Sequence, residues 1–288
     1  MEEKPASSWT LRLAALGFGI LGVAVVYLIA FKISNDIRVI SASGIIFLFC
    51  AAVWLGRNKS DWFSGIVLIA PMGTIFVYEV LYKVPALWPN LLLWAAAAAI
   101  GLVFLRMVRK RIASAIAVVA ALLLAAFWFC GWYTPKQLAS AYSKVKDTSA
   151  PRFNLQPVSR DFESARSGKI LVLDFFSTTC APCIAELPQL MAARGDLKDQ
   201  HDVEFVLVAS DRGNDTPEKF RAFAENRHVT MPLAFDPEGK AHESFGLTGV
   251  PALVILDRAG RVRFTHEGYN PAEATFRQDL VQFIKTLN

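Results

Sequence analysis

The chain has few cysteines and few histidines, and their scarcity restricts the chemistry it can perform. Its 288 residues include four of each. After residue 150 the cysteines are Cys180 and Cys183, and the histidines of the chain are His201, His228, His242 and His266. A zinc site needs four ligands at short, regular spacings. Because the histidines follow no such spacing, the sequence predicts no metal site.

Excess positive charge is absent from the second half of the chain. Residues 151–288 contain 16 Lys and Arg against 19 Asp and Glu, a net −3, whereas residues 1–150 contain 14 against 6, a net +8. A protein that binds nucleic acid needs a basic surface to neutralise phosphates. The excess of positive charge lies among the apolar segments of residues 1–150, so we assign it to the edges of a membrane. No nucleic-acid partner is expected.

Long apolar runs fill the chain before residue 134 and predict an α-helical transmembrane domain over residues 1–134. A helix needs about 20 apolar residues to cross a hydrocarbon core of about 30 Å. The first run is too long for a signal peptide and others follow it, so it is expected to be retained. The fourth run is the shortest. About five spans, surrounded by membrane lipid, are predicted: Leu13–Phe31, Val39–Gly56, Trp62–Tyr82, Leu91–Met107 and Ile112–Tyr133.

The Lys and Arg residues between these runs predict an orientation, because short cytoplasmic loops are enriched in both. With the N-terminus inside, eight basic residues lie on the inner side and three on the outer side. Five spans then place the C-terminal domain on the extracytoplasmic side of an inner or cytoplasmic membrane. If the fourth run does not cross, that domain faces the cytoplasm.

The two cysteines in the apolar runs, Cys50 and Cys130, could be a membrane redox pair. Under this topology their depths in the membrane differ by about 15 Å, whereas a disulfide requires Cα atoms within about 7 Å. They are interpreted as small apolar side chains.

Residues 135–150 are polar and are predicted to be a linker to a soluble domain over residues 151–288. The apolar run Ile170–Phe176 is typical of a buried central strand. Helices are expected from Ser159 to Ser167, from Pro182, from Thr216-Pro217, and from Asn270-Pro271 with Glu273 as part of its cap. With further strands at Val203–Ala209, Ala252–Leu256 and Arg261–His266, the domain is an α/β fold with a mixed sheet.

The sequence Cys180-Ala181-Pro182-Cys183 lies between a predicted strand and a predicted helix. A thiolate attacks a disulfide, and the unpaired N–H groups of a helix N-terminus stabilise a thiolate at Cys180. In such motifs a thiol pKa falls from ~8.5 to roughly 3.5–7.5. Pro182 suits the first turn of a helix, and Cys183, one turn in, is the resolving thiol. The alternatives are half of a zinc site and a structural disulfide, but this domain has no further cysteine, and structural disulfides usually close longer loops.

The segment C-A-P-C-I-A-E-L-P-Q-L is similar to the C-x-P-C-x-x-E-x-P-x-L signature of TlpA/ResA-type membrane-anchored oxidoreductases in the thioredoxin superfamily. The resemblance extends from Phe153 to the end of the chain and implies a thioredoxin fold. It implies that Asp174 is the buried acid that takes the proton of the resolving thiol, and that Pro188 kinks the active-site helix. It also implies that Pro251 is the cis-proline facing the cysteines, with Val250 offering backbone hydrogen bonds to a bound peptide.

These observations predict a dithiol oxidoreductase that reduces disulfides in exported proteins, apocytochromes c being one class of client implied by the resemblance. The redox group is the Cys180–Cys183 disulfide itself, so no cofactor is expected. An oxidising compartment does not reduce that disulfide, so an electron-donor redox protein is implied. A redox-sensing or scaffold protein is the alternative from another class. A peroxidase fits less well, because peroxidatic cysteines are not paired with their resolving partner in a CxxC motif.

Overall fold

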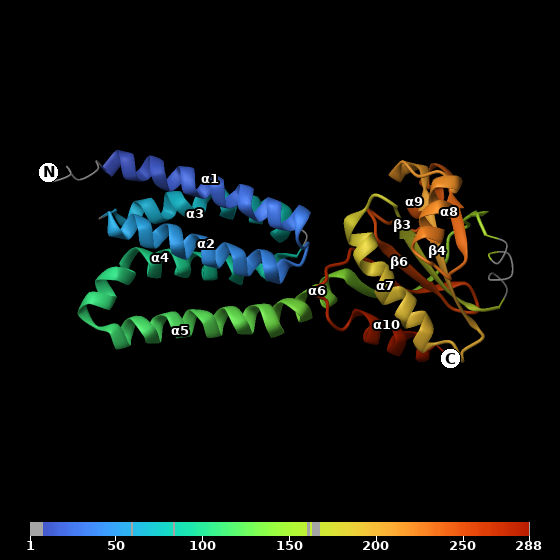
Figure 1. Ribbon diagram of the computed structural model, residues 1–288. Coiled ribbons are helices and arrows are strands. Elements are labelled where there is room, and N and C mark those ends of the chain that lie inside the picture. Colours follow the sequence, from blue (N-terminus) through green and yellow to red (C-terminus); the bar gives the residue numbers. More distant parts are fainter. Residues whose placement is uncertain (1–7, 59, 83, 160–161, 163–167, 288) are drawn as a thin grey trace. The chain divides into compact units, whose positions relative to one another are not determined.

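The chain divides into two compact units, Met1–Gln137 and Leu138–Asn288 (Figure 1). The structure is a computed structural model that describes residues 8–287, apart from residues 59, 83, 160–161 and 163–167. The first unit is helical, and the second is built around one β-sheet.

The helices of the first unit follow the predicted apolar runs, but their lengths differ from the prediction. Among the described residues, four helical segments are long and apolar enough to cross a membrane: Ser8–Lys32 (α1), Ile37–Arg57 (α2), Pro85–Lys110 and Ile112–Tyr142. The third of these contains the turn η2 (Pro85–Leu87) and α4 (Pro89–Lys110). The fourth contains α5 (Ile112–Trp128), the π-helical turn η3 (Phe129–Tyr133) and α6 (Thr134–Tyr142).

The prediction that the fourth run is the shortest is wrong, and the short helix is the third. Helix α3 (Trp62–Phe76) has 15 residues and contains Pro71, and the π-helical turn η1 (Val77–Leu81) continues it. Helix α4 has 22 residues because it begins at Pro89 and continues through basic residues to Lys110. A sequence pattern locates the apolar residues of a helix but not the polar residues that extend it.

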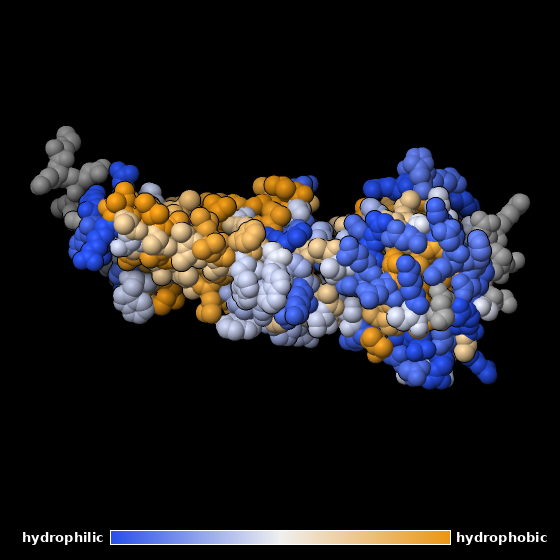
Figure 2. Space-filling view, turned by 90° about the horizontal axis from the view of Figure 1, so that it is seen from below, coloured by the Kyte–Doolittle hydropathy of each residue, from blue (hydrophilic) through white to orange (hydrophobic). Residues whose placement is uncertain are grey.

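Side chains at helix ends and small residues at helix contacts hold the first unit together. Asp61 caps α3 by accepting the Ser64 N–H at 3.0 Å and pairs with Arg12 of α1 at 2.7 Å. The Trp94 indole donates to the Ser41 carbonyl at 3.1 Å, and Gly44 allows this approach, since a Cβ there would lie 2.6 Å from the ring. Apolar side chains gather on the outer surface of this unit (Figure 2), including Leu124 and Phe127, 69% and 77% exposed. Such a surface suits lipid better than water.

The second unit contains a seven-stranded mixed sheet in the order β1-β7-β6-β3-β4-β5-β2. Strands β3, β4 and β5 run parallel, and the other pairs are antiparallel. The strands are β1 (Ser143–Ser149), β2 (Gln156–Pro157), β3 (Ile170–Phe176), β4 (Val203–Ser210), β5 (Leu233–Asp236), β6 (Ala252–Leu256) and β7 (Arg261–Glu267). The predicted α/β fold with a mixed sheet is confirmed, and β3 and β6 have the predicted bounds.

Helices cover both faces of this sheet (Figure 1). Helices α7 (Ala181–Asp196) and α10 (Phe276–Lys285) pack on one face, where Leu187, Leu190 and Leu280 meet Leu253 of β6. Helix α9 (Lys240–Ser244) lies on the other face, and α8 (Pro217–Asn226) begins after its N-cap Thr216, as predicted. The predicted helix at Ser159–Ser167 lies largely outside the described residues.

The last helix begins later than predicted. Helix α10 starts at Phe276, not at Pro271. The Asn270 side chain accepts the Ala272 N–H at 3.0 Å and forms a turn. Glu273 is buried beside His266, so contact with the sheet takes this side chain away from the helix end.

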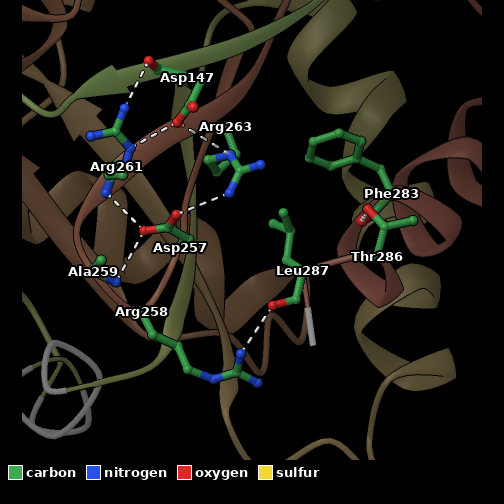
Figure 3. A network of polar contacts seen from close by, with 9 residues as sticks. All are labelled: Asp147, Asp257, Arg258, Ala259, Arg261, Arg263, Phe283, Thr286 and Leu287. Atoms are coloured by element: carbon green, nitrogen blue, oxygen red, sulfur yellow. Dashed lines mark hydrogen bonds and ion pairs between the residues drawn. The ribbon is translucent and has the colours of Figure 1, made fainter.

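The segment predicted as a linker also has regular structure. Residues 135–150 contain most of α6 and the whole of β1, which pairs with β7 from Ser143 opposite His266 to Ser149 opposite Arg261. Strand β1 is a polar edge strand fastened by charge (Figure 3). Asp147 lies 2.7 Å from Arg261 and 3.8 Å from Arg263, and Arg263 lies 3.2 Å from Asp257. Such a strand has no apolar alternation from which it could have been predicted.

Candidate active site

The turn after β3 places Cys180 at the start of α7. Cys180 is the N-cap of this helix, and its Sγ lies 3.3 Å from the Cys183 backbone N–H, which points toward it. Pro182 lies in the first turn, where a missing N–H costs nothing. The Cys183 N–H and the positive potential of the helix start therefore act on the sulfur of Cys180.

The two cysteines form a disulfide and differ in exposure. Their Cα atoms are 5.3 Å apart. Cys183 is buried, at 1% exposure, on the side of α7 that faces the sheet, whereas Cys180 is partly exposed. An external thiol or disulfide therefore reaches Cys180 and not Cys183. Pro188 lies within α7, which continues unbroken to Asp196.

A loop before β6 lies against the disulfide. The Val250–Pro251 peptide bond is cis, and the Val250 carbonyl oxygen lies 3.7 Å from Cys180 Sγ. Pro251 is buried, whereas Val250 is exposed beside the sulfur. The structure therefore brings Cys180, Val250 and Pro251 together.

Two side chains that the sequence did not single out hold this loop. His242 Nε2 lies 3.0 Å from the Gly249 carbonyl oxygen, and Glu267 accepts both the backbone N–H of Thr248, at 3.1 Å, and its hydroxyl, at 3.0 Å. Neither residue is marked by any local sequence pattern, because each reaches the loop through the tertiary fold.

Asp174 is buried in the central strand β3, on the face covered by α7. Its side chain is 4% exposed, and within the described part of the chain its Oδ1 has no hydrogen-bond partner. Burial raises the pKa of Asp174 well above the usual carboxyl range. A carboxyl group whose pKa is raised lies closer to a thiol in proton affinity, so it can exchange a proton with one.

Glu186 is a second buried acid at the site, to which the sequence analysis gave no role. It lies one turn after Cys183 on the buried side of α7 and is 1% exposed. Neither carboxyl oxygen has a hydrogen-bond partner among the described residues. Burial raises the pKa of Glu186, and the charges of Asp174 and Glu273 raise it further. Its helical spacing from Cys183 and Leu190 was the signal that could have revealed it.

A third acid, Asp215, supports the turn that carries Cys180. It is 2% exposed, and its Oδ2 accepts the Thr178 N–H at 3.0 Å. The Thr178 hydroxyl donates to the other oxygen. These bonds fix the backbone just before the cysteine pair. Over the described part of residues 8–287, no group of three or more His, Cys, Asp and Glu side chains is arranged to hold a metal ion.

The second unit is similar to known proteins. The family model described as Redoxin matches residues 141–280. The chain is 29% identical over 143 residues to the thioredoxin-like protein YneN of Bacillus subtilis, covering 47% of this chain and 82% of YneN. It is 33% identical over 118 residues to the thiol:disulfide interchange protein HelX of Rhodobacter capsulatus. That match covers 39% of this chain and 62% of HelX, so it spans less than two thirds of the length of HelX.

A solved structure also matches. The crystal structure of a putative thiol:disulfide interchange protein DsbE from Chlorobium tepidum is 22% identical, with a TM-score of 0.42, and the match covers 50% of this chain and 99% of that one. The sequence prediction of a thioredoxin-superfamily domain is confirmed by the Redoxin match and by the relatives.

Proposed function

Because residues 141–280 match the Redoxin family model, we propose that the chain is a membrane-anchored thiol–disulfide oxidoreductase that works through Cys180 and Cys183. One observation carries the proposal: a partly exposed sulfur at the start of α7 is bonded to a buried one, beside the cis-proline loop. An inert structural disulfide has no need for this asymmetry.

The reduced site reacts in two steps. The Cys180 thiolate attacks one sulfur of a substrate disulfide, forming a mixed disulfide, and the other substrate sulfur leaves as a thiolate that takes a proton. Cys183 then gives its proton to a buried carboxylate, Asp174 or Glu186, and attacks Cys180 Sγ. The second substrate sulfur leaves, two electrons have passed to the substrate, and the Cys180–Cys183 disulfide has re-formed.

The exposed residue Val250 beside the disulfide supports a polypeptide substrate. The carbonyl oxygen of Val250 lies beside Cys180 Sγ, on a loop that hydrogen bonds with His242 and Glu267 hold in place. A peptide laid along this loop would bring its disulfide onto Cys180. The proposed substrates are therefore disulfides of other proteins, and a second dithiol protein must return electrons to Cys180–Cys183.

The proposed location of the domain is the extracytoplasmic side of the membrane. The segment Trp62–Leu81 is helical throughout, and at about 1.5 Å per residue its 20 residues span about 30 Å, the thickness of a hydrocarbon core. If this segment crosses with the four longer ones, the number of spans is odd. The distribution of eight inner against three outer basic residues favours a cytoplasmic N-terminus.

The redox function is tested with cysteine variants of the full chain in detergent. Cys180→Ser abolishes reduction of a small fluorescent disulfide, whereas Cys183→Ser accumulates mixed disulfides that non-reducing gels resolve. Ser149→Cys on the wild-type background, at an exposed position of β1, controls for an added surface thiol. A wild-type chain that binds disulfide peptides without turning them over would instead support a sensor.

The orientation is tested by protease protection. Protease added to intact spheroplasts should cut the second unit, and a reporter that is active only in the cytoplasm should stay silent when fused at the C-terminal end. If the unit is cut only after lysis, it faces the cytoplasm, and exported proteins are not its substrates.

A further inference from the structure

A row of side chains crosses the sheet beneath α7 and α10. Asp174 of β3 lies opposite Leu253 of β6, Leu253 lies opposite His266 of β7, and His266 lies opposite Ser143 of β1. Directly opposed residues of neighbouring strands project from the same face. Asp174 and His266 therefore project from the face on which Leu253 packs against the two helices.

His266 and Glu273 form a buried pair on this face. His266 Nε2 lies 3.4 Å from Glu273 Oε2, and both side chains are 2% exposed. This is a close contact but not a well-aligned hydrogen bond, because both atoms lack a hydrogen-bond partner within the described residues. His266 Nδ1 lies 3.0 Å from the Ser143 hydroxyl, and the rings of Phe276 and Tyr142 enclose the imidazole.

Five titratable groups lie on this side of the sheet, each from a different element: Asp174 from β3, Glu186 from α7, His266 from β7, Glu273 from the turn before α10 and Tyr142 from α6. Burial, and then the charge of Glu273, raises the pKa of Tyr142 to about 12, so this phenol stays neutral. The charge of Glu273 also acts on Glu186. Among the described residues buried in this unit, His266 is the one side chain able to take positive charge.

Three carboxylates in one apolar region do not all ionise, because each charge disfavours the next. A protonated His266 cancels the charge of Glu273 and leaves Glu186 free to ionise. A neutral His266 leaves Glu273 uncompensated. The protonation state of this pair therefore bears directly on whether Glu186 can accept a proton.

We propose that His266 and Glu273 are positioning residues for the dithiol reaction, which hold a proton near Glu186 and thereby control its ability to accept the proton of Cys183. The inference rests on the proposed oxidoreductase function. The proton that leaves Cys183 Sγ passes to Glu186 or Asp174. The charge of the pair affects whether Glu186 keeps that proton, and the proton returns to sulfur when Cys180–Cys183 is reduced again.

The test uses the full chain in detergent and follows single turnovers of a fluorescent disulfide from pH 5 to pH 9. The initial attack and the resolution of the mixed disulfide are measured separately. The variants His266→Gln and Glu273→Gln are compared with His201→Gln and Glu225→Gln, which make the same chemical changes at exposed positions.

The two buried variants should shift the pH midpoint of the resolution step in opposite directions. Without His266 the charge of Glu273 is uncompensated, so the midpoint rises by about one pH unit and resolution near pH 7 slows about tenfold. Without the Glu273 carboxylate the midpoint falls. The rate of initial attack stays within about twofold in both variants, and the two exposed controls match the wild type.

Loss of packing alone would slow both variants in the same direction without moving the midpoint, and that result would overturn the inference. If either variant fails to fold, Ser143→Ala carries the test, because it removes only the hydroxyl beside Nδ1. It should raise the midpoint by less than His266→Gln does, and an unchanged midpoint would overturn the inference. A wild-type chain that reduces no disulfide would instead refute the proposed function.

Discussion

The two faces of the central sheet differ in the polar groups that they bury. Beneath α7 and α10 lie Asp174, Glu186, His266 and Glu273, several of them without hydrogen-bond partners in the described structure. The opposite face buries one carboxylate in its sheet, Asp236, whose oxygens accept the Ala241 and His242 N–H groups at 2.8 and 2.9 Å. An unpaired buried acid destabilises a fold, so the face beneath α7 and α10 carries a cost in stability that the opposite face does not.

The seven residues of strand β3 show this difference between the two faces of the sheet. Leu173 and Phe175 point into the apolar cluster under α9, whereas Asp174 points toward α7. Neighbouring residues of a strand face opposite sides, so one strand serves the packing of one face and the chemistry of the other. Substitutions at adjacent positions of β3 should therefore have different consequences.

The largest expected effect on stability comes from the apolar face. Leu173 is fully buried, and Leu173→Ala should lower the free energy of unfolding by about 2–5 kcal/mol, from lost burial and the cavity left behind. Pulse proteolysis in urea measures this on the full chain, because all seven tryptophans precede residue 134 and do not report on this unit.

The Leu173→Ala variant should keep the pH dependence of the wild type, since no titratable group changes. An altered pH dependence would show that the two faces are not independent. Val145→Ala, at an exposed position of β1, is a matched apolar control and should change stability little.

The next effect comes from the polar face and depends on pH. The folded-state pKa values of Asp174 and Glu186 are raised above their unfolded values. The folded state therefore holds protons that the unfolded state has released. The stability contributed by each group is complete below its usual pKa near 4 and is lost as pH rises toward the folded value, by about 1.4 kcal/mol per pH unit for one proton.

Glu186→Gln should flatten this decline, so that the oxidised variant is more stable than the wild type at pH 8 and nearly equal to it at pH 4. Urea unfolding at a series of pH values measures the slopes. Glu225→Gln, at an exposed position, should leave the slope unchanged. A Glu186→Gln chain that declines as steeply as the wild type would show that Glu186 does not hold a proton in the folded state.

The smallest effect is expected at the edge of the sheet. Asp147 pairs with Arg261 and Arg263 on an exposed surface (Figure 3), where ion pairs contribute about 0–1 kcal/mol and are screened by salt. Asp147→Asn should therefore lower stability by less than about 1 kcal/mol, and 0.5 M NaCl should remove the difference. A larger loss would mean that the β1 edge depends on this carboxylate.

The sequence predicted the strands of this fold that are continuous apolar runs. Ile170–Phe176 and Ala252–Leu256 are buried on both faces, so nearly every residue in them is apolar and their bounds follow from composition. The CAPC motif was found because its chemistry depends on two adjacent elements, a strand end and a helix start, that lie next to each other in the chain.

The parts that were missed depend on contacts between distant segments. Asn270 and Glu273 have the spacing of a helix cap, but in the structure Glu273 is buried in contact with His266 of β7. Glu186 has helical spacing from Cys183 and Leu190, which places the three side chains on one side of α7, but the burial of that side depends on the packing of α7 on the sheet.

Strand β1 has a practical consequence for preparing the second unit by itself. A fragment that begins at Pro151 lacks β1 and leaves the N–H and C=O groups of β7 uncovered along one edge, and such open edges promote self-association. It also lacks the Ser143 partner of His266. A fragment that begins at Leu138, where the second compact unit begins, retains the edge strand and should remain monomeric at concentrations at which the shorter one precipitates.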